Sequence, residues 1–351
     1  MITVRTPLRI SFLGGGSDFE EFFSQNTGAV FGATIDLYVY LSGALIPPFA
    51  SERFRFTYRK TESVQDPLDF EHPVARSLLS EWGNELPPLN LATMSDVPGN
   101  SGLGSSSSFA VGMVMLLNSI IGRKMSQHEL AAEAIQLERK VLAESGGWQD
   151  QLFASHGGLT LFEFTKQSQV NVKRIPESVA NISKLNEHIL LVPLTGSRQS
   201  GGFSDKYLKG IREVGKASLI SENAKLARST FETFMDARLS DDEKISRLGF
   251  AMRRAWEIKI ETSPEAELQR AAQLIQLGLS AGAIAGKLCG AGESGFILFI
   301  AAPSTKAKIL SALSASASYS PRITFGGAQV TYSGTDEARI SKNTWNLDRN
   351  P

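Results

Sequence analysis

A run of glycine and serine residues has the composition of an anion-binding loop. It spans 98–108, Pro-Gly-Asn-Ser-Gly-Leu-Gly-Ser-Ser-Ser-Ser, between an expected strand and an apolar segment. Glycines let a backbone approach a ligand closely, and free N–H groups at a helix N-terminus bind anions. We therefore predict a triphosphate cradle rather than a linker, because linkers rarely run directly into an apolar helix. The residues predicted to form it are Pro98, Gly99, Asn100, Ser101, Gly102, Leu103, Gly104, Ser105, Ser106 and Ser107.

Two carboxylates downstream of this loop could do chemistry. A helix is expected after Ser126, and Glu138 falls within the arc of that helix that carries leucine, alanine and valine. An inward-facing carboxylate is costly unless it is paired or binds a cation, so Glu138 is a candidate Mg²⁺ ligand. A buried ion pair with an arginine is the alternative. Asp150 lies 12 residues further on, after Gly146 and Gly147, where it could also serve as a simple helix cap.

Two further glycine-rich segments lie near opposite ends of the chain. Gly14-Gly15-Gly16-Ser17-Asp18 follows an expected strand and suits either the close approach of a polyol or a plain turn. The segment 290–295 contains Gly-x-Gly-x-x-Gly, but it precedes a strand, which reverses the dinucleotide-binding context. No Gly-x-x-x-x-Gly-Lys-Ser/Thr sequence occurs, so a Walker loop is excluded.

Strand-like and helix-like segments alternate in the first half of the chain, whereas the second half is mostly helical. We predict a domain boundary near residue 187, giving domains 1–187 and 188–351. Helices are expected at 73–82 and 109–118, after Ser126, and from start signals at 240–243 and 263–264. Strands are expected at 8–13, 29–35, 37–46, 53–58, 89–94, 188–194, 295–300 and 328–332.

Composition excludes several classes of protein. The chain of 351 residues carries 36 basic and 36 acidic residues, so no net charge attracts nucleic acid or an anionic membrane. Cys289 is the single cysteine, and the four histidines are scattered, which excludes a disulfide framework and the usual zinc sites. No signal peptide or membrane span is expected at the N-terminus or elsewhere. We expect a cytoplasmic protein whose oligomeric state, a homodimer among the alternatives, is left open.

Three of these segments, taken in order, resemble the motifs of the GHMP kinases. They are Pro7 to Asp18, the loop 98–108, and the segment Lys287-Leu-Cys-Gly-Ala-Gly-Glu-Ser-Gly-Phe at 287–296. Within that superfamily, the first motif and Gly-Trp-Gln-Asp-Gln at 147–151 are most similar to D-glycero-D-manno-heptose 7-phosphate kinases. The resemblance implies an α+β fold, with an N-terminal domain of the ribosomal S5 domain 2-like type and a ferredoxin-like C-terminal domain.

The resemblance also assigns roles by matched position. ATP would lie between the domains with its phosphates on the amides of 102–107, and Ser106 and Glu138 would hold Mg²⁺. Asp150 would act on the acceptor hydroxyl, either as a base or as an orienting charge, with Arg9 as its partner. The residues that would bind the substrate are Gly14, Gly15, Gly16, Ser17, Asp18, Gln151, Arg198, Gly290, Ala291 and Gly292.

Two departures from the superfamily pattern bear on the substrate. Galactokinases carry Gly-Glu-His-Thr-Asp where this chain has Gly-Gly-Gly-Ser-Asp at 14–18, which implies room for a larger or anionic substituent. The third motif has Glu-Ser at 293–294 where Gly-Gly is common. Arg198 is the first candidate partner for a 7-phosphate, and the basic strand with Arg53, Arg55 and Arg59 is the second.

The leading hypothesis is a kinase acting on the anomeric hydroxyl of a heptose 7-phosphate, in the synthesis of activated heptose for surface polysaccharide. A neutral-sugar kinase, of the L-fucokinase or galactokinase type, is the second. A non-catalytic regulator that binds ATP and sugar is the third, although Arg9, Glu138 and Asp150 argue against it.

Overall fold

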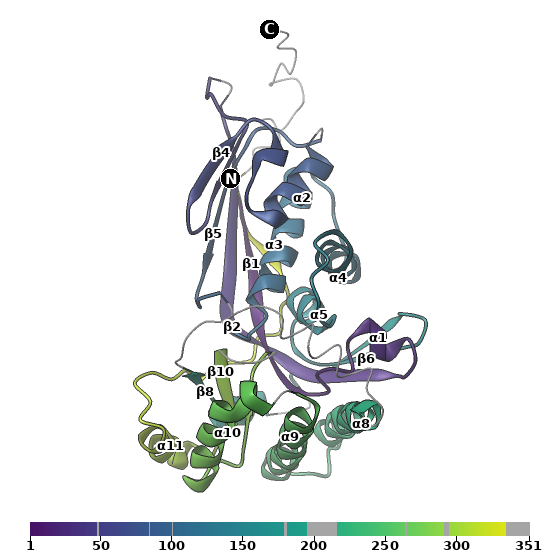
Figure 1. Cartoon of the computed structure of the whole chain (residues 1–351), viewed down its shortest axis with the longest axis vertical. Coiled ribbons are helices and arrows are strands. Elements are labelled where there is room, and N and C mark those ends of the chain that lie inside the picture. Colours follow the sequence, from purple (N-terminus) through teal and green to yellow (C-terminus); the bar gives the residue numbers. More distant parts are fainter. Residues whose placement is uncertain are drawn as a thin grey trace.

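Two β-sheets, each covered by helices, make up the protein (Figure 1). The computed structural model describes residues 1–47, 49–83, 85–99, 101–178, 181–194, 216–263, 265–290 and 295–334. An eight-stranded sheet with helices α2 to α5 forms the larger part, and a three-stranded sheet lies in the smaller, mostly helical part. The fold is therefore α+β, as the sequence predicts.

The larger sheet is built around the long hairpin of β1 (Ile2–Leu13) and β2 (Gly28–Leu45). β2 pairs with β6 through its first residues and with β5 through its last, so one strand supports two branches of the sheet. The strand order is β11-β1-β2-β5-β3-β4, with β6 and β7 on the other branch. The remaining strands are β3 (Phe54–Thr57), β4 (Thr61–Val64), β5 (Leu89–Ser95), β6 (Leu159–Phe164), β7 (Val170–Arg174) and β11 (Gln329–Ser333).

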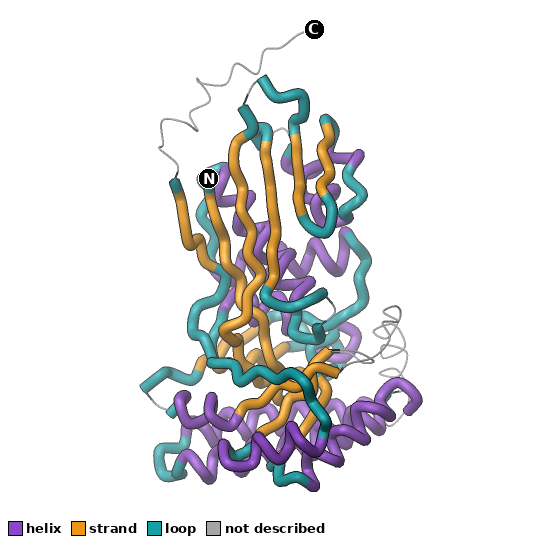
Figure 2. Tube along the Cα trace, turned by 90° about the vertical axis from the view of Figure 1, so that its left-hand side faces the viewer, coloured by secondary structure: helices purple, strands orange, loops and turns teal. Residues whose placement is uncertain are grey.

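Helix α3 (Ser105–Ile120) lies at the centre of the larger part, against β1, β2, α4 and α5. Its residues are apolar nearly all round, as a helix packed between a sheet and other helices requires. Figure 2 shows the strands in front and these helices behind them. The other helical elements here are α1 (Glu20–Phe23), the 3₁₀ turn Pro67–Asp69, α2 (Pro73–Trp82), α4 (Gln127–Gln136), the π-helical turn Leu137–Val141 and α5 (Gln149–His156).

The smaller part contains the sheet β8-β10-β9, all antiparallel, which α9 and α10 contact through β9. Its elements are α6 (Ile182–His188), β8 (Ile189–Leu194), α8 (Lys216–Met235), α9 (Asp241–Thr262), α10 (Glu265–Ser280), β9 (Ala285–Leu288), β10 (Gly295–Ile300), the 3₁₀ turn Pro303–Thr305 and α11 (Lys306–Ala312). The last described strand, β11, returns to the larger sheet beside β1. The boundary near residue 187 stays a prediction. None of the helices described here is long and apolar enough to cross a membrane.

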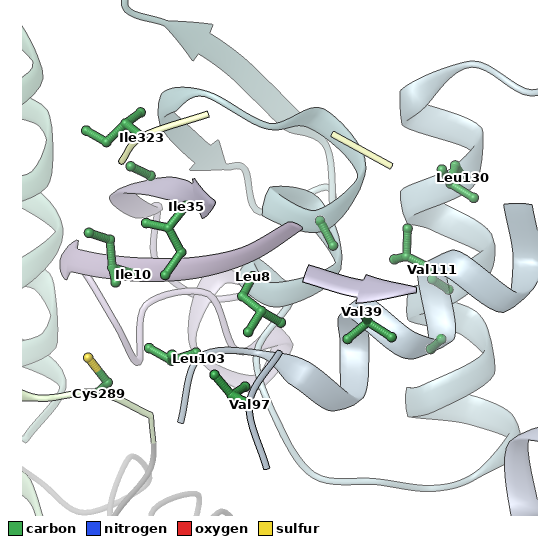
Figure 3. Close-up of a cluster of buried hydrophobic side chains, with 14 of the residues drawn as sticks. Leu8, Ile10, Ile35, Val39, Val97, Leu103, Val111, Leu130, Cys289 and Ile323 are labelled. Atoms are coloured by element: carbon green, nitrogen blue, oxygen red, sulfur yellow. The ribbon is translucent and has the colours of Figure 1, made fainter. Parts of the chain in front are cut away.

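The glycine-rich loop is held against the other two motifs by core packing and by the backbone. Leu103 and Cys289 belong to the same buried cluster as Leu8 and Ile10 (Figure 3). The Arg9 N–H donates to the Leu103 carbonyl at 3.0 Å. These contacts bring segments far apart in the sequence to one place.

Gly102 shows how close that approach is. Its φ is +71°, and a Cβ atom there would lie 2.5 Å from the Cys289 carbonyl oxygen. Gly290, at φ +72°, would in turn place a Cβ 2.6 Å from the Gly102 Cα. Backbone atoms cannot rotate away as a side chain can, so both positions require glycine.

We predict that Gly102→Ala destabilises the protein much more than Gly122→Ala. Both glycines have a positive φ, but a Cβ at Gly122 would have nothing within 4 Å. The backbone strain common to both costs about 1–2 kcal/mol, and the clash at Gly102 adds roughly 1–3 kcal/mol. Urea unfolding of both variants measures the difference. Equal losses of stability in the two variants would show that the loop 98–108 can move away from Cys289 and Gly290 without cost.

Candidate active site

A cavity of about 270 Å³ opens between the larger sheet and helix α9. Its charged lining residues fall into two groups by their place in the chain. The acids all come from the first half of the chain, whereas two of the bases come from α9 and β9. The charged residues in the lining are Arg9, Asp18, Glu138, Arg139, Glu144, Asp150, Lys259 and Lys287.

Arg9 and Asp150 form a two-bond ion pair in this cavity. Arg9 Nε donates to Asp150 Oδ1 at 2.8 Å, and Nη2 donates to Oδ2 at 2.9 Å. The third nitrogen, Nη1, donates to the Gly102 carbonyl at 2.6 Å. Gly104, at the N-terminus of α3, packs directly against the pair, because its Cβ would lie 3.4 Å from Asp150 Oδ2. A side chain of the first motif thus joins a carboxylate of α5 to the glycine-rich loop.

Asp18 lies fully buried at the end of the first glycine segment. Its carboxylate accepts hydrogen bonds from the N–H groups of Gly16 at 2.9 Å and Gln149 at 3.3 Å. Burial, together with repulsion by Asp150, raises the pKa of Asp18 to about 6. Gly147 packs against this carboxylate so closely that a Cβ there would overlap it. Asp18 is therefore a carboxylate with no cationic partner among the residues described, facing the cavity.

Glu138 is the inward-facing acid that the helix pattern predicts, and only 1% of it is exposed. It lies in the π-helical turn that follows α4, the kind of local widening that often occurs at functional sites. Burial raises the pKa of Glu138 to about 7. Hydrogen bonds from Gln151 and Ser107 lower this pKa but do not offset the effect of burial. No arginine forms a salt bridge with Glu138 within the described part of the chain, so the alternative of a buried ion pair is not what this turn contains.

The other predicted residues divide between the cavity wall and its support. Gly15, Gly16, Ser106, Ser107 and Gly290 line the cavity. Those outside the lining include Gly14, Ser17, Gln151, Pro98, Gly99, Ser101, Gly102, Leu103, Gly104 and Ser105.

Two of these supporting residues have identifiable partners. The Ser17 hydroxyl bonds the backbone of Gly14 and Ala29, and Gln151 donates to Glu138. The Ser17 bonds fix the backbone next to Asp18, and the Gln151 bond fixes the Glu138 carboxylate. Asn100, Arg198, Ala291 and Gly292 lie outside the described residues, and their roles stay predictions.

The basic strand suggested as a second phosphate partner does not reach the cavity. Arg53 donates to the Gly83 carbonyl and Arg55 pairs with Glu52. Arg59 lies against Gly99 in the glycine-rich loop. None of the three arginines is among the lining residues.

The sequence is similar to known kinases in the region that forms this cavity. Residues 70–158, which include the loop, Glu138 and Asp150, match the model of the GHMP kinases N terminal domain. A D-glycero-alpha-D-manno-heptose 7-phosphate kinase of Campylobacter jejuni is 28% identical over 89% of this chain and 93% of its own. Residues 70–158 are thus a GHMP kinases N terminal domain, and the chain is similar to a sugar kinase along nearly its whole length.

Two further relatives cover most of this chain. A D-glycero-D-manno-heptose 1-phosphate kinase from Bacteriodes thetaiotaomicron has the same fold, with a TM-score of 0.74 at 22% identity over 95% of this chain and 100% of that one. A bifunctional fucokinase/GDP-fucose pyrophosphorylase of Arabidopsis thaliana is 25% identical over 88% of this kinase, which spans only 30% of that relative.

This kinase domain implies ATP as the phosphoryl donor, and the residues present fit a magnesium ion beside it. Glu138 supplies a desolvated carboxylate, and Ser106 and Ser107 supply hydroxyls on the same wall. No cluster of three or more histidine, cysteine, aspartate or glutamate residues occurs among those described. Mg²⁺ does not need one, because it commonly binds one or two carboxylates together with phosphate oxygens and water.

Sequence reasoning missed two lysines of the kinase cavity. Lys259 on α9 donates to the Gly290 carbonyl, and Lys287 on β9 donates to the Phe12 carbonyl at 3.0 Å. Burial lowers the pKa of Lys259 to about 7 and that of Lys287 to about 8, and the charge of Arg9 adds to both shifts. Lys287 stands inside the third motif, whereas nothing in the helical pattern of α9 singles out Lys259.

We predict that the stability of Asp18→Asn, compared with that of the wild type, is higher at pH 7.5 than at pH 4 in the ligand-free kinase. The pKa of Asp18 is about 6 in the folded protein against 3.8 for an aspartate in water, so the folded state holds this proton more tightly. Stability is therefore lost as pH rises from about 4 to about 6, by about 3 kcal/mol at most. Asparagine removes that loss.

Urea unfolding of wild type and Asp18→Asn at both pH values measures the effect. Taking the difference between the proteins cancels the titrating groups that do not interact with Asp18. A difference independent of pH would contradict the assignment of a buried, unpaired charge at Asp18.

Proposed function

We propose that this kinase transfers the γ-phosphate of ATP to the anomeric hydroxyl of D-glycero-D-manno-heptose 7-phosphate, giving the 1,7-bisphosphate. The observation that carries the chemistry is the Arg9–Asp150 pair, which faces the cavity beside the N-terminus of α3. The acceptor class is supported by the Campylobacter jejuni relative, which this chain matches along nearly its whole length. The product would enter the synthesis of nucleotide-activated heptose for surface polysaccharide, in the cytoplasm.

The triphosphate would lie on the amides at the start of α3, which begins at Ser105 after Gly104 in the left-handed conformation. Unpaired N–H groups at a helix start favour anions, and Ser106 and Ser107 in the first turn of this helix line the cavity. Magnesium, held by Glu138 and Ser106, would neutralise phosphate charge. The supporting geometry is that these groups and Asp150 share one cavity wall.

Asp150 would orient the acceptor hydroxyl and take its proton as the new bond forms. The hydroxyl oxygen attacks the γ-phosphorus, the bond from that phosphorus to the β–γ bridging oxygen breaks, and ADP leaves. Two N–H donors from Arg9 fix the position of the carboxylate, so its geometry does not depend on the substrate. Positioning of this kind, more than covalent chemistry, accelerates phosphoryl transfer.

A neutral-sugar kinase is the second candidate, favoured by the similarity to the Arabidopsis thaliana fucokinase enzyme over most of this chain. Asp18 and the glycines at 15–16 would bind sugar hydroxyls equally well in either case. The two candidates differ in the length of the sugar and in whether the acceptor carries a phosphate.

Turnover across a panel of acceptors tests the proposal. ADP release should be fastest with D-glycero-D-manno-heptose 7-phosphate, compared with unphosphorylated heptose, mannose, L-fucose and galactose. Failure of every seven-carbon acceptor would remove this proposal, and a preference for L-fucose or galactose would establish the second candidate.

Asp150→Asn is the control for that panel, because it keeps the shape and removes the charge. We expect kcat to fall about 10²- to 10⁴-fold while the KM for ATP changes little. A variant as fast as the parent would mean that another group accepts the proton.

A further inference from the structure

Two lysines of the cavity have no acidic partner among the residues that the structure describes. Lys259 is partly exposed and Lys287 is 9% exposed, and both side chains line the cavity. Each has one hydrogen bond to a backbone carbonyl, and neither forms a salt bridge within the described residues. Besides burial, the cations Lys287 and Arg9 lower the pKa of Lys259, Arg9 also lowers that of Lys287, and the nearby Cys289 thiol opposes both shifts. Arg9 is already paired with Asp150, and no acid in the described ranges is left bonded to either lysine.

Uncompensated buried charge is costly, and proteins keep it where a ligand supplies the opposite charge. An ammonium group has three donors, so each lysine keeps two beyond its carbonyl bond. The lysines come from adjacent elements, because α9 packs on β9. Together they form a small basic wall in a cavity whose acids all come from the larger part of the protein.

We propose that Lys259 and Lys287 form a binding subsite for the phosphate group already carried by the acceptor. Their hydrogen bonds connect this wall to the acceptor side of the cavity. Lys287 holds the carbonyl of Phe12, just before the glycine segment that ends in Asp18. Lys259 holds the carbonyl of Gly290, in the third motif. The ATP phosphates have their own positive partners in the amides at the start of α3.

This inference rests on the proposed function only in naming a sugar phosphate as the acceptor. It gives the structural reason why a phosphorylated sugar should be preferred to a neutral one. It also replaces the basic strand of Arg53, Arg55 and Arg59, which lies outside the cavity, as the partner of the acceptor phosphate.

The test uses Lys259→Met and Lys287→Met in the full-length kinase, with Lys306→Met as the matched control. Lys306 also donates from a partly buried ammonium to a backbone carbonyl, that of Ile189, but it lies outside the cavity. Steady-state kinetics are measured with D-glycero-D-manno-heptose 7-phosphate, with unphosphorylated heptose and with ATP varied.

Each cavity variant should lower the ratio of kcat/KM for the sugar phosphate to kcat/KM for the unphosphorylated sugar by about 10- to 100-fold. Lys306→Met should leave the ratio as it is, and Lys259→Arg should restore part of it. A loss that is equal for both acceptors, or that falls mainly on the KM for ATP, would assign the lysines to the transferred phosphate and overturn the proposal. Unchanged kinetics would leave them a purely structural role, which also overturns it.

Binding of inorganic phosphate to the ADP-bound kinase, followed by ³¹P NMR, separates this proposal from the proposed function. Phosphate should bind the wild type and Lys306→Met, and bind at least tenfold more weakly to the two cavity variants. If no heptose phosphate is turned over but this difference is found, the acceptor is wrong and the subsite stands. If heptose 7-phosphate is turned over but the difference is absent, the subsite is wrong and the function stands.

Discussion

Charge buried in a protein must be compensated, and this constraint governs the cavity between the larger sheet and α9. Eight charged side chains of the described residues line it, and among them Arg9 and Asp150 form a two-bond ion pair. Asp18 and Glu138 are buried acids with raised pKa values, whereas Lys287, which is buried, and Lys259, which is partly exposed, are bases with lowered pKa values. Such a site is costly while empty, and its cost falls when a metal triphosphate and an anionic acceptor supply the missing charges.

The rest of the fold holds these groups where they cannot pair with one another. The β1–β2 hairpin fixes Arg9, α3 fixes the glycine-rich loop, and β9 with α9 fixes the lysines. Gly102 and Gly290 bring the second and third motifs into backbone contact, which a side chain at either position would prevent. The acids of the cavity therefore come from the larger part of the protein, and its two lysines, each bonded to a backbone carbonyl, come from α9 and β9.

The sequence predicts elements well where local signals and tertiary packing agree. Helix α2 spans Pro73–Trp82, as expected from its proline start, and Glu138 is buried, as its helical arc indicates. The strands expected at 29–35 and 37–46 are instead one strand, because pairing with β1 continues past Asp36 with a shift of register at Pro7. Strand β9, Ala-Gly-Lys-Leu at 285–288, is too short and too poor in branched residues to be recognised without its partner β10.

The site was predictable to the extent that motifs carry it. Arg9, Asp18, Glu138 and Asp150 meet in one cavity, but Gly14 and Ser17 of the same motif support the backbone instead of lining it. Lys259 could not be found, since it looks like any charged residue on a long helix until α9 packs on β9.

The central claim is that the start of α3 and Glu138 together bind a metal triphosphate. A crystal structure with Mn²⁺, a non-hydrolysable ATP analogue and heptose 7-phosphate tests it directly, because the anomalous signal locates the ion. The account predicts the ion bonded to Glu138 and the Ser106 hydroxyl, with the γ-phosphate between it and Asp150. A triphosphate bound elsewhere, with Glu138 turned to pair with Arg139, would contradict it.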